Sequence, residues 1–282
     1  MIEINKIYNE DCFETMKKMG AGVVDVILTS PPYNTSKSRG TWDKDQKTHY
    51  DLPEVDSMSD SEYEDFTVNL FLNYDKVLKE NGVVLYNISY STDKPFQMFK
   101  AVNKVMEKTD FRVADTIIWK KKSALPNNMS HNRLTRICEF VFVLCREKEL
   151  KTFNMNKEIL SVRPNGIKQY TTCYNFVEAK NNDGSCKLNK ATFSSELCTS
   201  LLNMYAKPNA IVYDRFMGTG TTAISCVSNG WSFIGSELSQ QQCEYAEQRI
   251  SEISPEQVKV VKTDSPKIQK QLNWLDELLG GD

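Results

Sequence analysis

The chain has 282 residues, of which 40% are hydrophobic and 26% charged, a composition typical of a globular protein that excludes a collagenous, low-complexity or disordered chain. Its 35 lysines and arginines nearly balance 37 aspartates and glutamates, and the net charge of −2 argues against a protein that binds polyanions over its whole surface. The charge is uneven, because residues 115–190 hold 14 basic and 7 acidic side chains, and we expect this segment to form a basic surface.

Short apolar runs alternate with longer amphipathic segments along the chain. The runs predict strands at residues 23–28, 83–86, 114–119, 140–144, 210–213 and 231–235. The amphipathic segments predict helices at residues 61–79, 94–108, 193–206, 221–229, 240–252 and 268–279. This alternation favours an α/β fold with a mostly parallel sheet and helices on both faces. Polar sequence interrupts the pattern at residues 35–60 and 146–190, where we expect insertions.

Cysteine and histidine usage indicates neither a metal site nor a disulfide framework. The eight cysteines include no CxxC pair, and there are only two histidines, so no zinc site is expected. The N-terminal segment lacks the basic flank and apolar stretch of a signal peptide, and no apolar run approaches the ~18 residues of a membrane span. We therefore expect a soluble, cytoplasmic protein.

The sequence TSPPYN at residues 29–34 directly follows the strand predicted at residues 23–28. Ligands of open α/β sheets bind beyond the carboxyl ends of strands, so chemistry is expected here. The two prolines fix the backbone and leave rigid carbonyl acceptors. With the Ser30 hydroxyl, these acceptors could bind both hydrogens of an exocyclic amino group and free its lone pair for attack, while the Tyr33 ring stacks on a planar base. The alternative is a stiff turn that merely ends a strand.

A second motif, IVYDRFMGTGTT at residues 211–222, runs from a strand through a glycine-rich turn into a helix. Gly218 and Gly220 permit close approach of a ligand, and the helix N-terminus can hold a carboxylate or phosphate. Asp214 can bind an ammonium group, and Glu237 after the next strand can bind ribose hydroxyls. A dinucleotide and S-adenosylmethionine both fit, but only about 70 residues follow residue 210, too few for a second mononucleotide-binding half. S-adenosylmethionine therefore matches better.

The order of the two motifs resembles the β group of DNA amino-methyltransferases, in which the catalytic motif precedes the cofactor motif. Further segments that resemble this family lie at residues 9–12, 78–83, 117–120, 133–143, 191–194, 233–238 and 245–250. The chain departs from the family at Arg215, where proline is common, and at Asn189-Lys190, where His-Pro is common.

The resemblance implies the Rossmann-like sheet of class I S-adenosylmethionine-dependent methyltransferases, circularly permuted, with an inserted target-recognition region. It divides the chain into a catalytic half at residues 1–145, a target-recognition insertion at 146–190 and a cofactor-binding half at 191–282.

The resemblance also implies methyl transfer from S-adenosylmethionine to an exocyclic amino group of a flipped base in double-stranded DNA. Serine before the two prolines favours N4 of cytosine, because N6-adenine enzymes of the family usually have aspartate at this position. N6 of adenine is the alternative. The motif order argues against an RNA or protein-amide methyltransferase, and the intact residues at both sites argue against a noncatalytic nucleotide-binding module. A second copy of the chain and a cognate restriction endonuclease stay open as further partners.

Three sets of site residues follow from the resemblance. The catalytic residues are Ser30, Pro31, Pro32 and Tyr33. The cofactor-binding residues are Asp11, Cys12, Phe193, Ser194, Asp214, Phe216, Gly218, Gly220, Thr221, Thr222 and Glu237. The cations expected to contact DNA phosphates are Lys120, Lys121, Lys122, Arg133, Arg136 and Lys168. Each cation taken singly is also typical of a solvated surface. Cys12 is interpreted as packing rather than as a nucleophile, and the sequence identifies no acceptor for the proton that leaves the methylated nitrogen.

Overall fold

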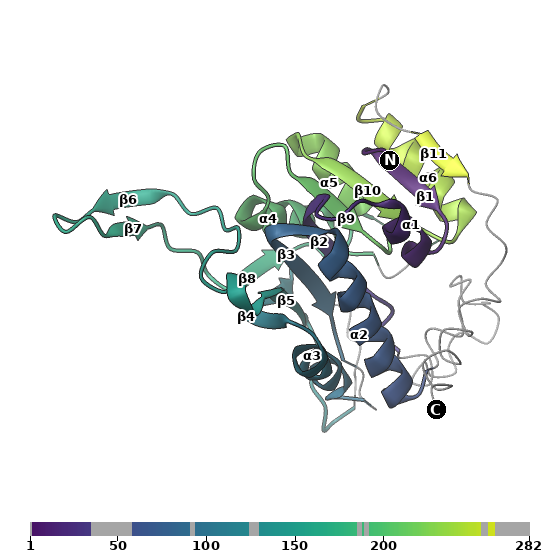
Figure 1. Cartoon of the computed structure of the whole chain (residues 1–282). Coiled ribbons are helices and arrows are strands. Elements are labelled where there is room, and N and C mark those ends of the chain that lie inside the picture. The colour runs from purple at the N-terminus through teal and green to yellow at the C-terminus, as the bar shows by residue number, and fades with distance from the viewer. Residues whose placement is uncertain are drawn as a thin grey trace, which may run out of the picture.

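The computed structural model describes residues 2–34, 58–90, 94–123, 130–184, 188, 192–254 and 259–262. Its centre is a nine-stranded sheet in the order β11-β1-β10-β9-β2-β3-β5-β4-β8 (Figure 1). The strands are β1 (Lys6–Asn9), β2 (Val24–Thr29), β3 (Leu78–Ile88), β4 (Phe111–Lys121), β5 (Cys138–Arg146), β8 (Phe176–Ala179), β9 (Ile211–Asp214), β10 (Ser232–Ser236) and β11 (Lys259–Lys262). Among the described strands of this sheet only β5 runs against its neighbours. The predicted mostly parallel α/β sheet is confirmed.

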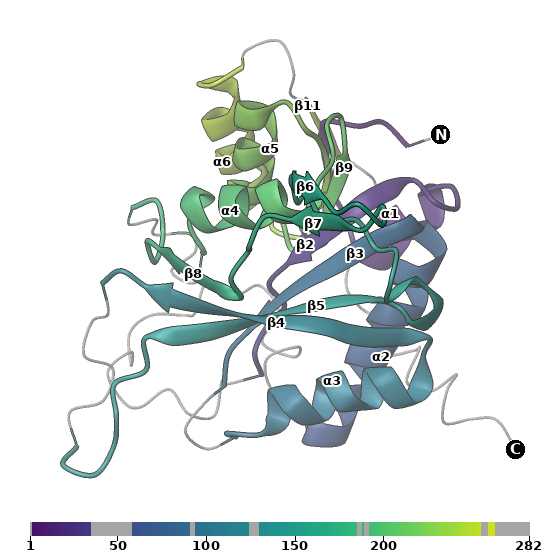
Figure 2. The ribbon, with the colours of Figure 1, turned by 90° about the vertical axis from the view of Figure 1, so that its left-hand side faces the viewer.

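Helices cover both faces of the sheet (Figure 2). One face carries α4 (Ser195–Tyr205), α5 (Thr221–Asn229) and α6 (Gln240–Ser251), and the other carries α1 (Cys12–Lys18), α2 (Asp60–Val77) and α3 (Gln97–Lys108). Two buried apolar clusters follow, one on each face. Val26 and Leu28 belong to the first cluster and Ile27 to the second, because side chains alternate along a strand. A strand buried on both faces is nearly continuous in apolar residues, which is why β2 is recognisable in the sequence despite Asp25.

Two strands far apart along the chain pair at the centre of the sheet. Strand β2 pairs in parallel with β9 through Val26 with Val212 and Ile27 with Tyr213. The Asp25 carboxylate supports this junction, because its Oδ2 accepts hydrogen bonds from Ile211 N at 2.8 Å and from Lys79 Nζ at 2.7 Å. We call the edge at which the parallel strands β1, β10, β9, β2, β3 and β4 end the carboxyl edge.

Residues 146–190 combine an excursion from the sheet with one of its strands. The short helix η4 (Glu147–Glu149) is followed by a hairpin of β6 (Ile159–Val162) and β7 (Lys168–Tyr170), which projects from the body in Figure 1. The chain then returns as β8, which pairs with β4. The segment expected as an insertion thus adds a strand to the central sheet, and the three-part division of the chain stays a prediction.

Some expected elements differ from the structure or lie outside it. Strand β1 and helix α1 are absent from the prediction, because the sequence KIYN and a helix of seven residues give little periodic signal. The helix expected at 268–279 and all but the last three residues of the insertion expected at 35–60 fall outside the described residues. No helix in the described ranges is long and apolar enough to cross a membrane.

The two ends of α5 offer a paired test of packing. Gly220 has φ +84°, and an added Cβ would lie 2.8 Å from Ala246 Cβ. Gly230 has φ +78°, but an added Cβ would meet nothing within 4 Å. Gly230→Ala should cost about 1 kcal/mol of left-handed strain, and Gly220→Ala about 1–3 kcal/mol more from overpacking. Denaturant unfolding measures both losses, and equal losses would contradict this packing.

Candidate active site

The segment that follows β2 is held by hydrogen bonds to α2 and to the residues just before α2. The Tyr63 hydroxyl donates a hydrogen bond of 2.9 Å to the Pro32 carbonyl. The Asn34 side chain donates to the Met58 carbonyl at 2.8 Å, and Asn34 has φ +52°, which asparagine tolerates better than most residues. Two consecutive prolines stiffen the same turn. The turn therefore presents Ser30 and its neighbours from a rigid support at the carboxyl edge.

Five polar side chains meet beside this turn, and we call them the serine cluster: Ser30, Tyr33, Asn87 of β3, Lys121 of β4 and Glu139 of β5. The Tyr33 hydroxyl lies 2.9 Å from Ser30 Oγ and donates to Glu139 Oε2 at 3.0 Å. Asn87 Nδ2 donates to the Tyr33 hydroxyl at 3.0 Å and to Glu139 Oε2 at 3.2 Å. Lys121 Nζ donates to Glu139 Oε1 at 2.5 Å. The cluster is a connected network ending on one carboxylate.

The sequence analysis assigns neither Asn87 nor Glu139 to a site. Each is a polar residue in a mainly apolar strand near the carboxyl edge, which is the available signal, but only the strand order brings the two together. Asn87 is 1% exposed, and its Oδ1 has no hydrogen-bond partner within the described ranges. An unpaired buried acceptor is costly, so a donor from a bound molecule would stabilise the site.

The glycine-rich turn lies next along the carboxyl edge, between β9 and α5. Asp214 ends β9, and its carboxylate accepts from Phe216 N at 3.0 Å and from Thr222 Oγ1 at 2.6 Å. Gly218 N donates to Glu237 Oε2 at 2.9 Å. Gly218 and Gly220 have φ +54° and +84°, as the expected tight turn requires. Two acidic side chains thus flank one turn, joined to it by hydrogen bonds.

Burial raises the pKa of both carboxyl groups. It raises the pKa of Asp214 from 3.8 to about 6, although the hydrogen bonds from Thr222 and Phe216 oppose the shift. Burial also raises the pKa of Glu237, against the hydrogen bonds from Ser239 and Gly218. A cation or hydroxyl donors brought by a ligand would compensate this desolvation.

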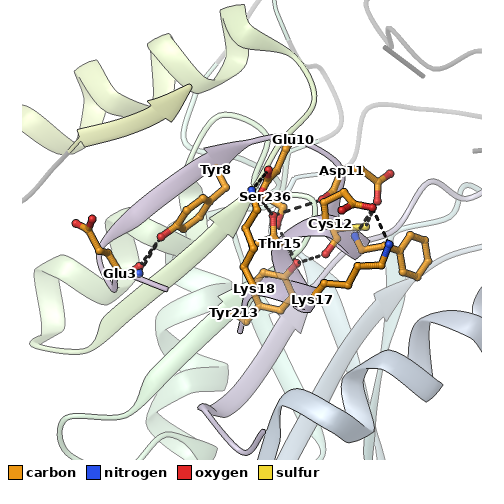
Figure 3. A network of polar contacts seen from close by, with 12 residues as sticks. Glu3, Tyr8, Glu10, Asp11, Cys12, Thr15, Lys17, Lys18, Tyr213 and Ser236 are labelled. Carbon is orange, nitrogen blue, oxygen red and sulfur yellow. Dashed lines mark hydrogen bonds and ion pairs between the residues drawn. The ribbon is translucent and has the colours of Figure 1, made fainter. Parts of the chain in front are cut away.

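The segment after β1 also lies at the carboxyl edge, and Figure 3 shows its polar network. Asp11 caps α1 by accepting from Phe13 N at 2.7 Å. Asn9 Nδ2 donates to the Glu237 and Leu238 carbonyls, each at 2.9 Å, and ties this segment to the end of β10. Cys12 is 5% exposed, and burial raises the pKa of its thiol to about 12. A neutral buried thiol agrees with packing rather than nucleophilic attack.

The remaining residues expected around the turn have structural contacts of their own. Thr221 is buried at the start of α5. Ser194 is fully buried and caps α4 by accepting from Leu197 N at 3.3 Å, while Phe193 is partly buried against the core. Arg215 is 3% exposed, and its guanidinium lies 4.0 Å from the Phe216 ring centre.

The six cations expected to contact phosphate fall into three groups. Lys120, Lys121 and Lys122 each pair with a carboxylate, of Glu178, Glu139 and Glu196 respectively. Arg136 donates from Nη1 to the Tyr90 carbonyl at 2.7 Å, and Arg133 is exposed in the connection from β4 to β5 at the carboxyl edge. Lys168 is exposed on the hairpin. The connection between β5 and this hairpin bonds the Asn81 and Met204 carbonyls near the opposite edge of the sheet.

Comparison with known proteins gives consistent matches over most of the chain. A sequence model of the family described as DNA methylase matches residues 24–248. The chain is 26% identical over 262 residues to the type II methyltransferase M.HinfI of Haemophilus influenzae, covering 89% of this chain and 70% of the relative. Among solved structures, the PvuII DNA methyltransferase (cytosine-N4-specific) has a TM-score of 0.66 at 15% identity and covers 99% of this chain and 96% of its own. A putative DNA modification methylase of Thermus thermophilus, complexed with S-adenosyl-L-methionine, has a TM-score of 0.61 at 16% identity, with coverages of 93% and 99%.

The raised pKa of Asp214 predicts a pH-dependent stability. The folded protein holds this proton more tightly than the unfolded chain does, so the free energy of unfolding falls as the pH rises from 3.8 to about 6 and stays lower above it. The fall is about 3 kcal/mol. Urea unfolding of wild type and Asp214→Asn across this range should show the wild type losing that amount relative to the variant. A difference independent of pH would contradict the raised pKa.

Proposed function

The chain belongs to the DNA methylase family, and we propose that it transfers a methyl group from S-adenosylmethionine to N4 of cytosine in double-stranded DNA. The family makes it a DNA methyltransferase that acts on an exocyclic amino group of cytosine or adenine. One observation carries the choice of site: the β2–β9 pairing brings the serine cluster and the glycine-rich turn to neighbouring strand ends. The structural likeness to a cytosine-N4-specific enzyme and the serine at position 30 support the choice of base.

The target base must leave the stack, at a cost of a few kcal/mol, before its amino group reaches the serine cluster. The Tyr33 ring would stack on the base. Ser30 Oγ and the Ser30 and Pro31 carbonyls are the candidate acceptors for the two amino hydrogens. The Pro32 carbonyl is not among them, because it already accepts a hydrogen bond from Tyr63. Catalysis is then mainly positioning and electrostatic stabilisation, without a covalent intermediate on the protein.

The residues beside the glycine-rich turn fit the proposed cofactor, which supplies an electrophilic methyl group when bound. The ribose hydroxyls would donate to Glu237, whose carboxylate retains lone pairs beyond those used by Gly218 and Ser239. The α5 N-terminus favours a carboxylate, and Asp214 favours an ammonium group. Asp11 and Cys12 would border the adenine, with Phe193, Ser194 and Phe216 closing the pocket. These assignments rest on the polar groups that the turn gathers.

We further propose that DNA lies along the carboxyl edge over the connection from β4 to β5. Arg133 is exposed in this connection, which also holds Arg136 and follows the end of β4, where the three paired lysines lie. A phosphate near Lys120 or Lys122 would compete with a carboxylate at the surface, where such ion pairs are weak. Lys168 would contact DNA only if the duplex reaches the hairpin.

The modified base tests the proposed function. Purified protein is incubated with unmethylated bacterial genomic DNA and isotopically labelled S-adenosylmethionine, and the DNA is digested to nucleosides. The label should appear in N4-methyldeoxycytidine, and Tyr33→Ala should reduce it by about 10²-fold or more while still binding the cofactor. Label in N6-methyldeoxyadenosine would overturn the choice of base, and label in RNA or protein alone would overturn the DNA substrate.

Charge reversal tests the DNA surface. Arg133→Glu should weaken DNA binding and lower the slope of log affinity against log salt by about 1, because one phosphate contact is lost. Lys207→Glu is the control, since Lys207 is exposed before β9 at the opposite edge. A lowered slope for Lys168→Glu together with an unchanged slope for Arg133→Glu would move the DNA surface to the hairpin.

A further inference from the structure

Resting on the proposed function, we propose that Glu139 accepts the proton that leaves the methylated nitrogen, through Ser30 and Tyr33. Methylation of an amino group leaves a nitrogen that must lose one hydrogen to become neutral. A serine hydroxyl can orient that hydrogen but is too weakly basic to keep the proton. The acceptor must therefore lie beyond Ser30, and the serine cluster leads to one carboxylate.

The hydrogen bonds that join Ser30, Tyr33 and Glu139 run in one direction, towards the carboxylate. The Tyr33 hydroxyl has a single hydrogen, which it donates to Glu139 Oε2 at 3.0 Å. In the 2.9 Å contact between the two hydroxyls, Tyr33 must then be the acceptor and Ser30 the donor. Asn87 Nδ2 also donates to Tyr33, which reinforces this arrangement. Asn87 Nδ2 also donates to Ser30 Oγ at 3.5 Å, so one Ser30 lone pair remains for an incoming amino group, and the Ser30 hydrogen is directed towards Tyr33 and the carboxylate beyond it.

Glu139 is the end of the hydrogen-bonded chain that starts at Ser30. Its carboxylate accepts from Tyr33 and Asn87 at Oε2 and from Lys121 at Oε1, and the two oxygens together have about four lone-pair sites, so one remains. The side chains of Glu139 and Lys121 are 12% and 25% exposed. The acceptor is therefore largely shielded from bulk water but lies beside a lysine side chain that reaches solvent.

The step balances in atoms and charge. The nitrogen lone pair forms a bond to the methyl carbon, the carbon–sulfur bond breaks, and its electron pair stays on sulfur. One N–H bond then breaks, and its electron pair stays on nitrogen while the proton passes to Ser30 Oγ. The original Ser30 proton passes to the Tyr33 oxygen, and the original Tyr33 proton passes to Glu139 Oε2. The products are a neutral methylated amine and a neutral carboxylic acid.

Glu139 acts through Tyr33 and Ser30, so it is a positioning residue and the terminal proton acceptor, whereas Ser30 is the group that touches the base. The other two buried carboxyl groups of the site, Asp214 and Glu237, are assigned to the cofactor and accept hydrogen bonds from the glycine-rich turn.

The same relay would serve N4 of cytosine and N6 of adenine, because both lose one amino hydrogen.

Glu139→Gln tests the relay, because the amide keeps the shape of the side chain but cannot accept the proton. Single-turnover methylation of unmethylated genomic DNA at saturating S-adenosylmethionine should slow by about 10²-fold or more. Affinities for S-adenosylmethionine and DNA should stay within about threefold of wild type, since Glu139 itself contacts neither. Glu147→Gln is the matched control, because Glu147 pairs with Arg112 at 2.8 Å just after the far end of β5. It should methylate at the wild-type rate.

Chemical rescue separates proton transfer from support of the fold. Glu139→Ala should be as slow as Glu139→Gln, and added formate should restore its single-turnover rate at least about tenfold, because formate supplies a carboxylate in the vacated space. Chloride at the same ionic strength should restore nothing. A Glu139→Gln rate within about threefold of the Glu147→Gln rate would overturn the relay, as would slow variants that formate does not rescue. Failure of the wild type to methylate DNA would instead overturn the proposed function.

Discussion

Strands β2 and β9 pair in parallel at the centre of the sheet, although nearly two hundred residues separate them along the chain. Parallel pairing makes both strands end at the carboxyl edge, where β2 continues into the prolines and β9 into the glycine-rich turn. The Asp25 carboxylate holds the junction through Ile211 N and Lys79. Each motif alone is a tight turn with many uses, and the proposed methyltransferase site depends on their juxtaposition.

The reversed direction of β5 supplies what the parallel strands cannot. A parallel strand brings its last residues to the carboxyl edge, whereas β5 brings its first residues there and so carries Glu139 to Tyr33. Lys121, at the end of β4, meets the same carboxylate from the other side. The antiparallel strand thus adds an acid to a turn whose own side chains are a serine and a tyrosine.

The features that can be predicted from the sequence are those set by residues close together along the chain. Strand β2 is apolar except for Asp25 and its last residue, and the turn at Gly220 requires a positive φ that glycine tolerates, so both are recognisable from local sequence. Strand β1 is not predicted, because its four residues show no clear alternation of apolar and polar side chains. The roles of Asn87 and Glu139 are not predicted from the sequence, because their contact depends on strand order and direction. The partners of Lys120 and Lys122 come from β8 and α4, so their pairing could not be read from a basic segment.

The most direct measurement is a crystal structure of the protein with its target DNA and a cofactor analogue that cannot donate a methyl group. The account predicts a flipped base stacked on Tyr33, with its amino nitrogen about 3 Å from Ser30 Oγ and from a carbonyl of the turn. Ser30, Tyr33 and Glu139 should stay connected by hydrogen bonds. A flipped base whose amino group contacts other side chains, or a Tyr33 hydroxyl detached from Glu139 in that complex, would contradict the account.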